Sequence, residues 1–301
     1  MYSPLIAIVG AGNVGATTAY TLMRSHLSAT VGLADIESDL CKGHCSDLED
    51  GSANTMTSHI VSLSLDEVRH ADIIIIAAGK PQKPGQSRLD LCAYNCHLVE
   101  TLTTILKPVN PHAHLIIVTN PVDVLTTLFM QTHLLPAPQI FGTGTYLDTQ
   151  RFRIYLSHYL NVSATAIQGF VLGEHGDSQF IPWQYVTIGG IPAEEYHITQ
   201  ETRHDIASKT RHKAYTIIKQ KCATYFGIAA CIDELCHAII YDRRIIAPLS
   251  WSHNNIPVCL SLPVILGAQG VEPTISLSLT AEQETLLQQS IDQISRILFG
   301  S

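Results

Sequence analysis

Short apolar runs alternate with longer amphipathic stretches through the first half of the chain. The run at Asp72–Ala78 contains four successive isoleucines, which is typical of a strand that is covered on both faces. Similar runs lie at Leu5–Val9, Val31–Ala34, His114–Thr119 and Gln139–Gly142. The helix-like stretches between them reach about residue 27 after the first run and cover 39–51, 87–106 and 122–133. Alternation of this kind predicts an α/β fold with a doubly wound parallel sheet.

The second half has a different pattern. Long helices are expected at 146–160, from about 199 to 225 with a continuation to about 240, and at 280–299. The last of these begins with Thr280-x-x-Gln283, a capping-box pattern. Short apolar runs at 166–172, 245–249 and 258–266 suit strands. We therefore predict two domains: 1–143 with the doubly wound sheet, and an α+β substrate-binding domain over 144–301.

Composition excludes several classes of protein. The chain has 301 residues, 46% hydrophobic and 15% charged, which is ordinary for globular domains. Its net charge of -8 would repel a phosphate backbone, so nucleic acid is not expected as a partner. No apolar run approaches the ~20 residues of a membrane span, and Leu5–Val9 is too short for a signal peptide. We expect no membrane partner and a cytoplasmic location.

The cysteines indicate free thiols rather than a metal centre. There are eight, with no C-x-x-C pair, as expected for buried or half-buried thiols in a reducing compartment. Cys41, His44 and Cys45 lack the second half of a zinc site. We predict no metal site.

A glycine-rich loop points to a nucleotide. Gly10-Ala11-Gly12-Asn13-Val14-Gly15 has the spacing G-x-G-x-x-G between an apolar run and a helical stretch. There the first glycine permits a tight turn, the second lets the backbone approach a pyrophosphate, and the third lets helix and strand pack closely. The helix N-terminus adds free N–H groups and the positive end of its dipole. The alternative is a glycine turn that binds nothing.

Asp35 suggests which nucleotide is bound. It ends the second apolar run, twenty residues after Gly15. A carboxylate there can accept hydrogen bonds from both ribose hydroxyls and would repel a 2′-phosphate, which favours NAD over NADP. We predict a Rossmann-type NAD-binding domain with the cofactor at Gly10, Gly12, Asn13, Val14, Gly15 and Asp35.

Three later residues carry acid–base and anion chemistry. His175 lies in Leu172-Gly173-Glu174-His175-Gly176-Asp177-Ser178, after an expected strand, and an imidazole exchanges protons near neutral pH. Asp148 and Arg151 share a face of an expected helix. An aspartate can hold a histidine ring, and an arginine can bind a carboxylate through two parallel hydrogen bonds. Periodicity alone still favours a surface ion pair and an ordinary histidine.

Five motifs in sequence order change that balance. They are Val9–Gly15, Ala78–Leu91, Val118–Asp123, Gly142–Arg153 and Leu172–Ser178. Together they span nearly the whole chain and resemble the L-lactate/malate dehydrogenase family. The resemblance implies an NAD-dependent oxidoreductase that acts on a CH–OH group and interconverts an L-2-hydroxy acid and its 2-oxo acid.

The resemblance also implies catalytic roles. His175 would be the proton donor and acceptor, with Asp148 as its partner, and Arg151 would bind the substrate carboxylate. Arg88 would polarise the carbonyl from a mobile loop at 80–86 that closes over the site and excludes water. The remaining implied contacts are Asn120 with substrate and cofactor, Thr224 with substrate near the nicotinamide, and Ala78 and Gly79 with the cofactor.

Gln82 bears on the substrate. In the family this position carries glutamine in lactate-type enzymes and arginine in malate-type enzymes. Oxaloacetate brings a second carboxylate that needs a cation, whereas a buried unpaired arginine over the methyl group of pyruvate would cost several kcal/mol. Pyruvate and L-lactate are therefore favoured. A bulkier acid such as 2-oxoisocaproate and oxaloacetate stay open, because Cys222 replaces a glycine common in the family beside the pocket.

Two further expectations concern class and assembly. A non-catalytic NAD-binding protein is the alternative from another class, since fold does not fix function. Relatives are dimers or tetramers, which implies a homo-oligomer, with a tetramer favoured and a dimer possible. Arg153 matches one residue of the sugar-bisphosphate site of allosteric relatives, but Gln168 stands in place of the expected histidine, so such activation is not predicted.

Overall fold

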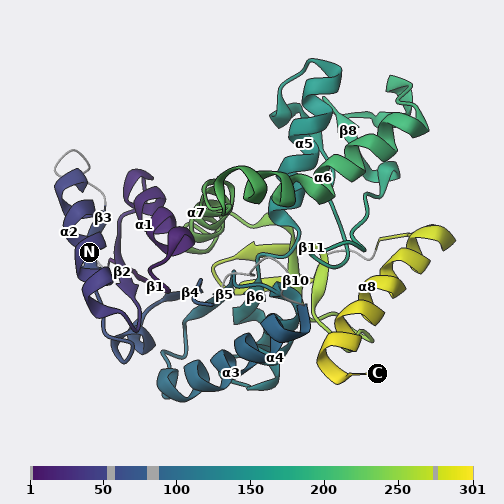
Figure 1. The fold of residues 1–301 in the computed structure, drawn as a ribbon. Coiled ribbons are helices and arrows are strands. Elements are labelled where there is room, and N and C mark those ends of the chain that lie inside the picture. Colours follow the sequence, from purple (N-terminus) through teal and green to yellow (C-terminus); the bar gives the residue numbers. More distant parts are fainter. Residues whose placement is uncertain (1–2, 53–57, 80–87, 274–276, 301) are drawn as a thin grey trace.

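The computed structural model describes residues 3–52, 58–79, 88–273 and 277–300, and for residues 58, 88–94 and 96 the backbone alone. A parallel sheet forms one half of this part of the chain (Figure 1). Its strand order is β3-β2-β1-β4-β5-β6. The strands are Leu5–Val9 (β1), Ala29–Ala34 (β2), Ser58–Ser62 (β3), Ile73–Ile76 (β4), His114–Ile117 (β5) and Ile140–Gly142 (β6). This is the order of a doubly wound sheet, whose direction of winding reverses between β1 and β4.

Alternate side chains of the central strands enter different cores. In β4, Ile73 and Ile75 pack on one face with residues of α1 (Asn13–Arg24), α2 (Ser38–Ser52) and α7 (Phe226–Ile240). Ile74 and Ile76 pack on the other face with α3 (Arg88–Leu106) and α4 (Val122–Gln131). Four isoleucines therefore suit this strand because both of its faces are buried, each side chain contributing about 1.5–3 kcal/mol.

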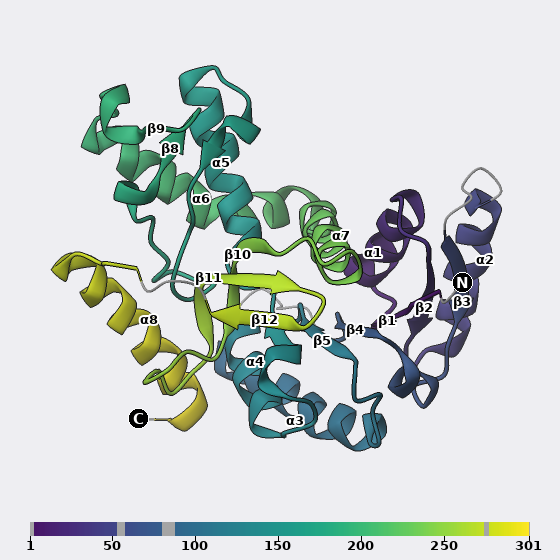
Figure 2. The same cartoon turned by 180° about the vertical axis from the view of Figure 1, so that it is seen from behind.

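Three antiparallel strands from the end of the chain extend the same sheet (Figure 2). They are Ile245–Trp251 (β10), Leu260–Gly267 (β11) and Gly270–Pro273 (β12), and β10 joins β6 through the single pair Ser250↔Gly142. The predicted doubly wound fold with a following α+β region is confirmed. The sheet, however, continues across the predicted boundary at residue 143, which stays a prediction.

A separate lobe is built around two long helices, α5 (Tyr146–Leu160) and α6 (Gln200–Lys221). Its core contains Phe152 of α5, Ile206 of α6 and a small sheet of Ile167–Gln168 (β7), Thr187–Ile188 (β8) and Ile191–Pro192 (β9). The C-terminal helix α8 (Ala281–Phe299) packs instead on α4 through Ile294 and Val124. It begins at the Thr280 capping box, as its sequence predicts.

Two expectations about elements were wrong in detail, and four short strands were not expected. The strand expected at 166–172 is only Ile167–Gln168, because Gly169 leaves the strand conformation with φ +152°. The helix expected through 225 ends at Lys221, where Cys222 takes left-handed φ 69° as the C-cap. The short strands β3, β8, β9 and β12 were not expected, since their runs are brief and lack a clear alternation.

No helix in the described part of the chain is long and apolar enough to cross a membrane.

Candidate active site

The glycine loop lies at the carboxyl ends of β1 and β4, where the direction of the sheet winding reverses. Gly10 has φ +107°, and a Cβ there would lie 2.5 Å from the backbone nitrogen of Ala78. A Cβ at Gly15 would lie 1.8 Å from the Gly10 carbonyl oxygen. Both positions therefore exclude any other residue. At Gly12 a Cβ would meet nothing within 4 Å, so the backbone there faces open space that a ligand can approach.

The start of α1 suits an anionic ligand. Gly12 is its N-cap and makes no side-chain capping bond, so the first N–H groups of the helix, at Asn13 and Val14, meet no capping side chain. Asp35, at the end of β2, accepts hydrogen bonds from the backbone N–H of Ala11 at 2.7 Å and of Glu37 at 3.1 Å. Ala78 and Gly79 follow β4 on the neighbouring strand end. The free N–H groups at the helix start and the carboxylate of Asp35 are the features that a dinucleotide site requires.

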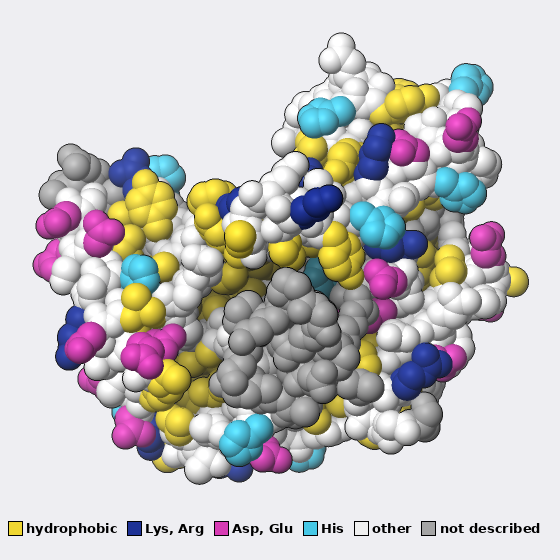
Figure 3. Space-filling model, viewed as in Figure 1, with side chains coloured by type: hydrophobic (Ala, Val, Ile, Leu, Met, Phe, Trp, Pro, Cys, Tyr) yellow, Lys and Arg dark blue, Asp and Glu magenta, His cyan; other side chains and the backbone are white. Residues whose placement is uncertain are grey.

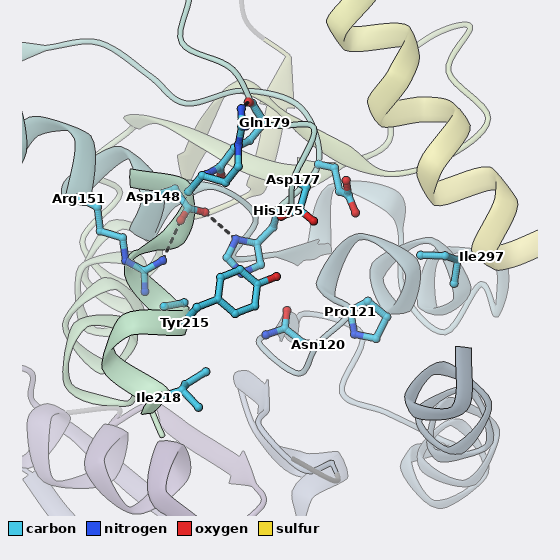
Figure 4. A pocket seen from close by; sticks show the side chains of 14 residues that line it. Asn120, Pro121, Asp148, Arg151, His175, Asp177, Gln179, Tyr215, Ile218 and Ile297 are labelled. Carbon is cyan, nitrogen blue, oxygen red and sulfur yellow. Dashed lines mark hydrogen bonds and ion pairs between the residues drawn. The ribbon is translucent and has the colours of Figure 1, made fainter. Parts of the chain in front are cut away.

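The three predicted catalytic and substrate-binding residues, His175, Asp148 and Arg151, lie together in one cluster (Figure 4). Asp148 bridges the other two: its Oδ2 lies 2.6 Å from His175 Nδ1, and its Oδ1 accepts a hydrogen bond from Arg151 Nη1 at 2.8 Å. The Asp148 and Arg151 side chains are 2% and 7% exposed, and that of His175 is 25% exposed. The surface ion pair that periodicity alone favours is therefore wrong, because both members are buried.

Local structure fixes each partner of this cluster. Asp148 and Arg151 lie in the first turns of α5, which Phe152 anchors in the core of the lobe through an edge-to-face contact with Trp183. The segment before His175 is tied to β11, because Gly173 N–H donates to the Ser261 carbonyl oxygen at 2.9 Å. The imidazole is thus held between a lobe helix and the main sheet.

Charges in the cluster favour the ionised forms of both acid and base. Burial opposes ionisation of Asp148, but the charge and hydrogen bond of His175, and then Arg151, outweigh it and lower the pKa of Asp148. Burial likewise opposes protonation of His175, yet the charge and hydrogen bond of Asp148 outweigh it and raise the pKa of His175 above its usual value. The raised pKa favours the protonated imidazole, which carries a proton on Nε2 that it can donate.

The cluster opens into a cavity of about 160 Å³ that Asn120 also lines. Asn120 follows β5, and its carbonyl oxygen accepts a hydrogen bond from the buried Asn95 side chain at 2.7 Å. Sequence reasoning missed six other lining residues, of which Gln179, Arg211 and Tyr215 have polar side chains. Arg211 and Tyr215 lie four residues apart on α6, so helical periodicity signals a shared face, but nothing in the sequence says that this face meets His175.

Three other predicted substrate contacts are not among the described residues that line this cavity. Gln82 and the predicted loop at 80–86 are outside the described residues, and Arg88 is described only as the first backbone position of α3. Thr224 lines a second cavity of about 790 Å³, which shares Arg151 with the first. Its predicted contact with the substrate stays a prediction.

This second cavity has a basic rim that includes Lys213 and Lys221, and Figure 3 shows Lys and Arg side chains on the ridge over α6.

Known proteins share this architecture over the whole chain. Residues 5–142 match the profile of the lactate/malate dehydrogenase NAD-binding domain, and residues 145–298 match that of the lactate/malate dehydrogenase alpha/beta C-terminal domain. The chain belongs to the lactate/malate dehydrogenase family. The predicted family is confirmed, and so is the class of enzyme, an NAD-dependent oxidoreductase that acts on a CH–OH group.

Individual relatives agree along almost their full lengths. L-lactate dehydrogenase A of Rhizopus oryzae is 36% identical over 297 residues, which cover 98% of this chain and 92% of that protein. L-lactate dehydrogenase of Thermoanaerobacter pseudethanolicus is 36% identical over 303 residues, covering 97% of each. The ligand-bound structure of the minor L-lactate dehydrogenase of Enterococcus mundtii superposes with a TM-score of 0.91 at 32% identity, covering 98% of both chains.

Proposed function

We propose that this protein is an L-lactate dehydrogenase, which reduces pyruvate with NADH to L-lactate and catalyses the reverse reaction. The observation that carries the proposal is the buried contact of 2.6 Å between His175 and Asp148 beside Arg151, in a cavity that Asn120, after the carboxyl end of β5, also lines. Full-length relatives named L-lactate dehydrogenases support the same reaction.

The chain's own residues would handle the proton. When bound at Gly10, Gly12, Asn13, Val14, Gly15, Asp35, Ala78, Gly79 and Asn120, NAD supplies the site that accepts or gives up a hydride. His175 would donate its Nε2 proton to the carbonyl oxygen during reduction and take it back during oxidation. Asp148 would fix the tautomer through Nδ1 and stabilise the imidazolium.

Two arginines and an amide would position the substrate. Arg151 would bind the carboxylate through paired hydrogen bonds while it keeps its contact with Asp148. Arg88 would polarise the carbonyl, and Asn120 would orient the substrate from the end of β5. Thr224 would contact the substrate from the loop after α6.

Gln82 would select against a second carboxylate. A neutral amide facing the methyl group of pyruvate leaves no unpaired charge, whereas oxaloacetate would leave its second carboxylate without a cation. We propose NAD rather than NADP as cofactor, because Asp35 would repel a 2′-phosphate. We also propose a cytoplasmic homo-oligomer, with a tetramer favoured over a dimer, and a functional boundary near residue 143.

The test is the initial rate of NADH oxidation by the purified protein with pyruvate, 2-oxoisocaproate and oxaloacetate, each over a range of concentrations. The proposal predicts the highest kcat/KM with pyruvate, and oxidation of L-lactate but not D-lactate in reverse. A preference for 2-oxoisocaproate or oxaloacetate would refute pyruvate as the substrate but would leave the proposed reaction, reduction of a 2-oxo acid by NADH, in place. In the Gln82→Arg variant the preference should move toward oxaloacetate, and failure to do so would refute the role of Gln82.

A further inference from the structure

A second buried carboxylate approaches His175 from the opposite half of the molecule. Asp123 lies in the first turn of α4 and is 3% exposed. Its Oδ2 accepts a hydrogen bond of 2.7 Å from the backbone N–H of His175. Asp148 holds the ring of the same residue from α5. His175 is therefore held by carboxylates at both its backbone and its side chain.

The surroundings of Asp123 support its charge less than burial opposes it. Its Oδ1 has no hydrogen-bond partner of normal geometry among the described residues. Ser250, 0% exposed, and the His175 imidazole favour the ionised form, while Glu174 opposes it. Cys259 is the other titratable group near Asp123, and burial raises the pKa of this thiol to about 12, so it stays neutral. Burial outweighs the favourable contacts and raises the pKa of Asp123 to about 6.

A structural role alone does not account for a carboxylate at this position. The N–H of His175 needs one acceptor, and an asparagine oxygen would serve without the cost of burying a charge. What the carboxylate adds is negative charge near an imidazole in a poorly solvated site, where charges interact more strongly than in water. Among the described residues, the charged groups that act on His175 are Asp148, Asp123 and Arg151; of these, Arg151 opposes its protonation.

We propose that Asp123 is a positioning residue for the proton-transfer step: its carboxylate fixes the backbone of His175, and its charge stabilises the imidazolium together with Asp148. The proposal rests on the proposed role of His175 as proton donor. Because Asn120 precedes Pro121, the N-cap of α4, the same helix start places both a residue that lines the cavity and the anchor of the histidine.

The pH dependence of this support has a definite sign. Above about pH 6 Asp123 is ionised and favours protonated His175. Below that pH Asp123 is itself protonated, and its support is lost. Replacing Asp123 with asparagine keeps an oxygen for the N–H and removes the charge, so the variant should match the wild type at low pH and diverge from it above pH 6.

The first experiment is the pH profile of kcat/KM for pyruvate reduction in the wild type and in Asp123→Asn. We expect the apparent pKa of the descending limb to fall by about one unit, and kcat/KM at pH 8 to drop by about five- to tenfold with little change at pH 5.5. Asp72→Asn is the matched control, because that carboxylate also accepts a backbone N–H, from Leu5 at 2.8 Å, but at the other end of β1 and β4. Identical profiles for Asp123→Asn and the wild type would overturn the proposal, whatever the change in Tm.

A second experiment does not depend on turnover. The His175 Cε1 resonance of histidine-labelled protein, assigned by its loss in His175→Gln, reports the imidazole pKa in wild type and Asp123→Asn. In His175→Gln itself, the pKa of the Asp123 carboxyl, read from its ¹³C shift, should rise because the coupling is reciprocal. Unchanged values in both titrations would overturn the proposal, even in a protein that reduces no 2-oxo acid. Coupled titrations in a protein without activity would instead refute the proposed function and leave the coupling in place.

Discussion

Asp148 and Asp123 are both almost fully buried beside His175, yet their pKa values move in opposite directions. That of Asp148 is lowered and that of Asp123 is raised to about 6. Asp148 has a hydrogen-bonding cation on each carboxylate oxygen, His175 on one and Arg151 on the other. Asp123 accepts a backbone N–H on one oxygen, and the Ser250 hydroxyl and the more distant charge of His175 favour its ionised form, but no arginine or lysine of the described residues bonds to it.

The difference shows that partners, more than depth of burial, decide the charge state of a buried acid. Burial opposes ionisation in both cases, and only two close cations overcome it. Asp148 is therefore ionised, and can stabilise a protonated imidazole, throughout the neutral pH range. Asp123 can do so only over the upper part of that range, and it makes the folded protein less stable when it ionises.

The largest expected effect is the loss of kcat/KM when Asp148, the aspartate with hydrogen bonds from two basic side chains, is made neutral. Asp148→Asn should lower kcat/KM for pyruvate reduction by about 10²–10⁴-fold, because the amide no longer stabilises the imidazolium or fixes its tautomer. Steady-state kinetics at pH 7 measures this loss. A loss no larger than that of Asp123→Asn would contradict the ranking of the two acids.

Arg151→Lys tests the other cation of the cluster. A lysine keeps the charge but cannot form two parallel hydrogen bonds with a carboxylate, so kcat/KM should fall by about ten- to a hundredfold, mainly through KM. The pH profile should keep its shape, since the contact between His175 and Asp148 is retained. A large change in the profile with KM unaltered would show that Arg151 serves Asp148 rather than the substrate.

At pH 8, replacing each aspartate with asparagine should change the free energy of unfolding in opposite directions. Because the folded-state pKa of Asp123 is raised, ionisation costs stability as pH rises from about 4 to 6, and Asp123→Asn should gain on the order of 2 kcal/mol at pH 8 and nothing at pH 4. Asp148 has a lowered pKa, so its contribution is present at neutral pH and is lost in acid. Asp148→Asn should therefore lose stability at pH 8. Urea unfolding at both pH values measures these changes, and a loss for Asp123→Asn at pH 8 would contradict the comparison.

The smallest expected effect is on the free energy of unfolding, from a substitution at a residue that contacts neither aspartate. Cys222 ends α6 with φ 69°, a conformation that glycine adopts without strain, and its side chain is exposed. Cys222→Gly should raise the free energy of unfolding by about 0.5–1 kcal/mol at every pH. Asn161, which ends α5 at φ 54°, is the control, because asparagine tolerates this region and Asn161→Gly should change stability less. A pH-dependent gain in Cys222→Gly would show that the loop reaches the titrating groups.

The sequence predicts the sheet and the His175, Asp148 and Arg151 cluster because each has a local signature: four isoleucines, a glycine loop, a helix spacing and ordered motifs. The role of Asp123 could not be predicted in the same way, although it lies within the quoted motif Val118–Asp123. Its contact is with a backbone N–H 52 residues away, which no pattern of side chains encodes. Arg211 and Tyr215 show the same limit, since periodicity identifies a helix face but not what that face meets.

The most direct test of the central claim, that His175 paired with Asp148 donates the proton, is the pH dependence of kcat/KM for pyruvate reduction by the wild-type protein. A raised His175 pKa predicts a plateau at acidic pH and a fall of about tenfold per pH unit above an apparent pKa higher than 6.5. Lactate oxidation should show the opposite limb, rising through the pKa of the free enzyme. A reduction rate that rises with pH, or is flat through pH 9, would contradict the account.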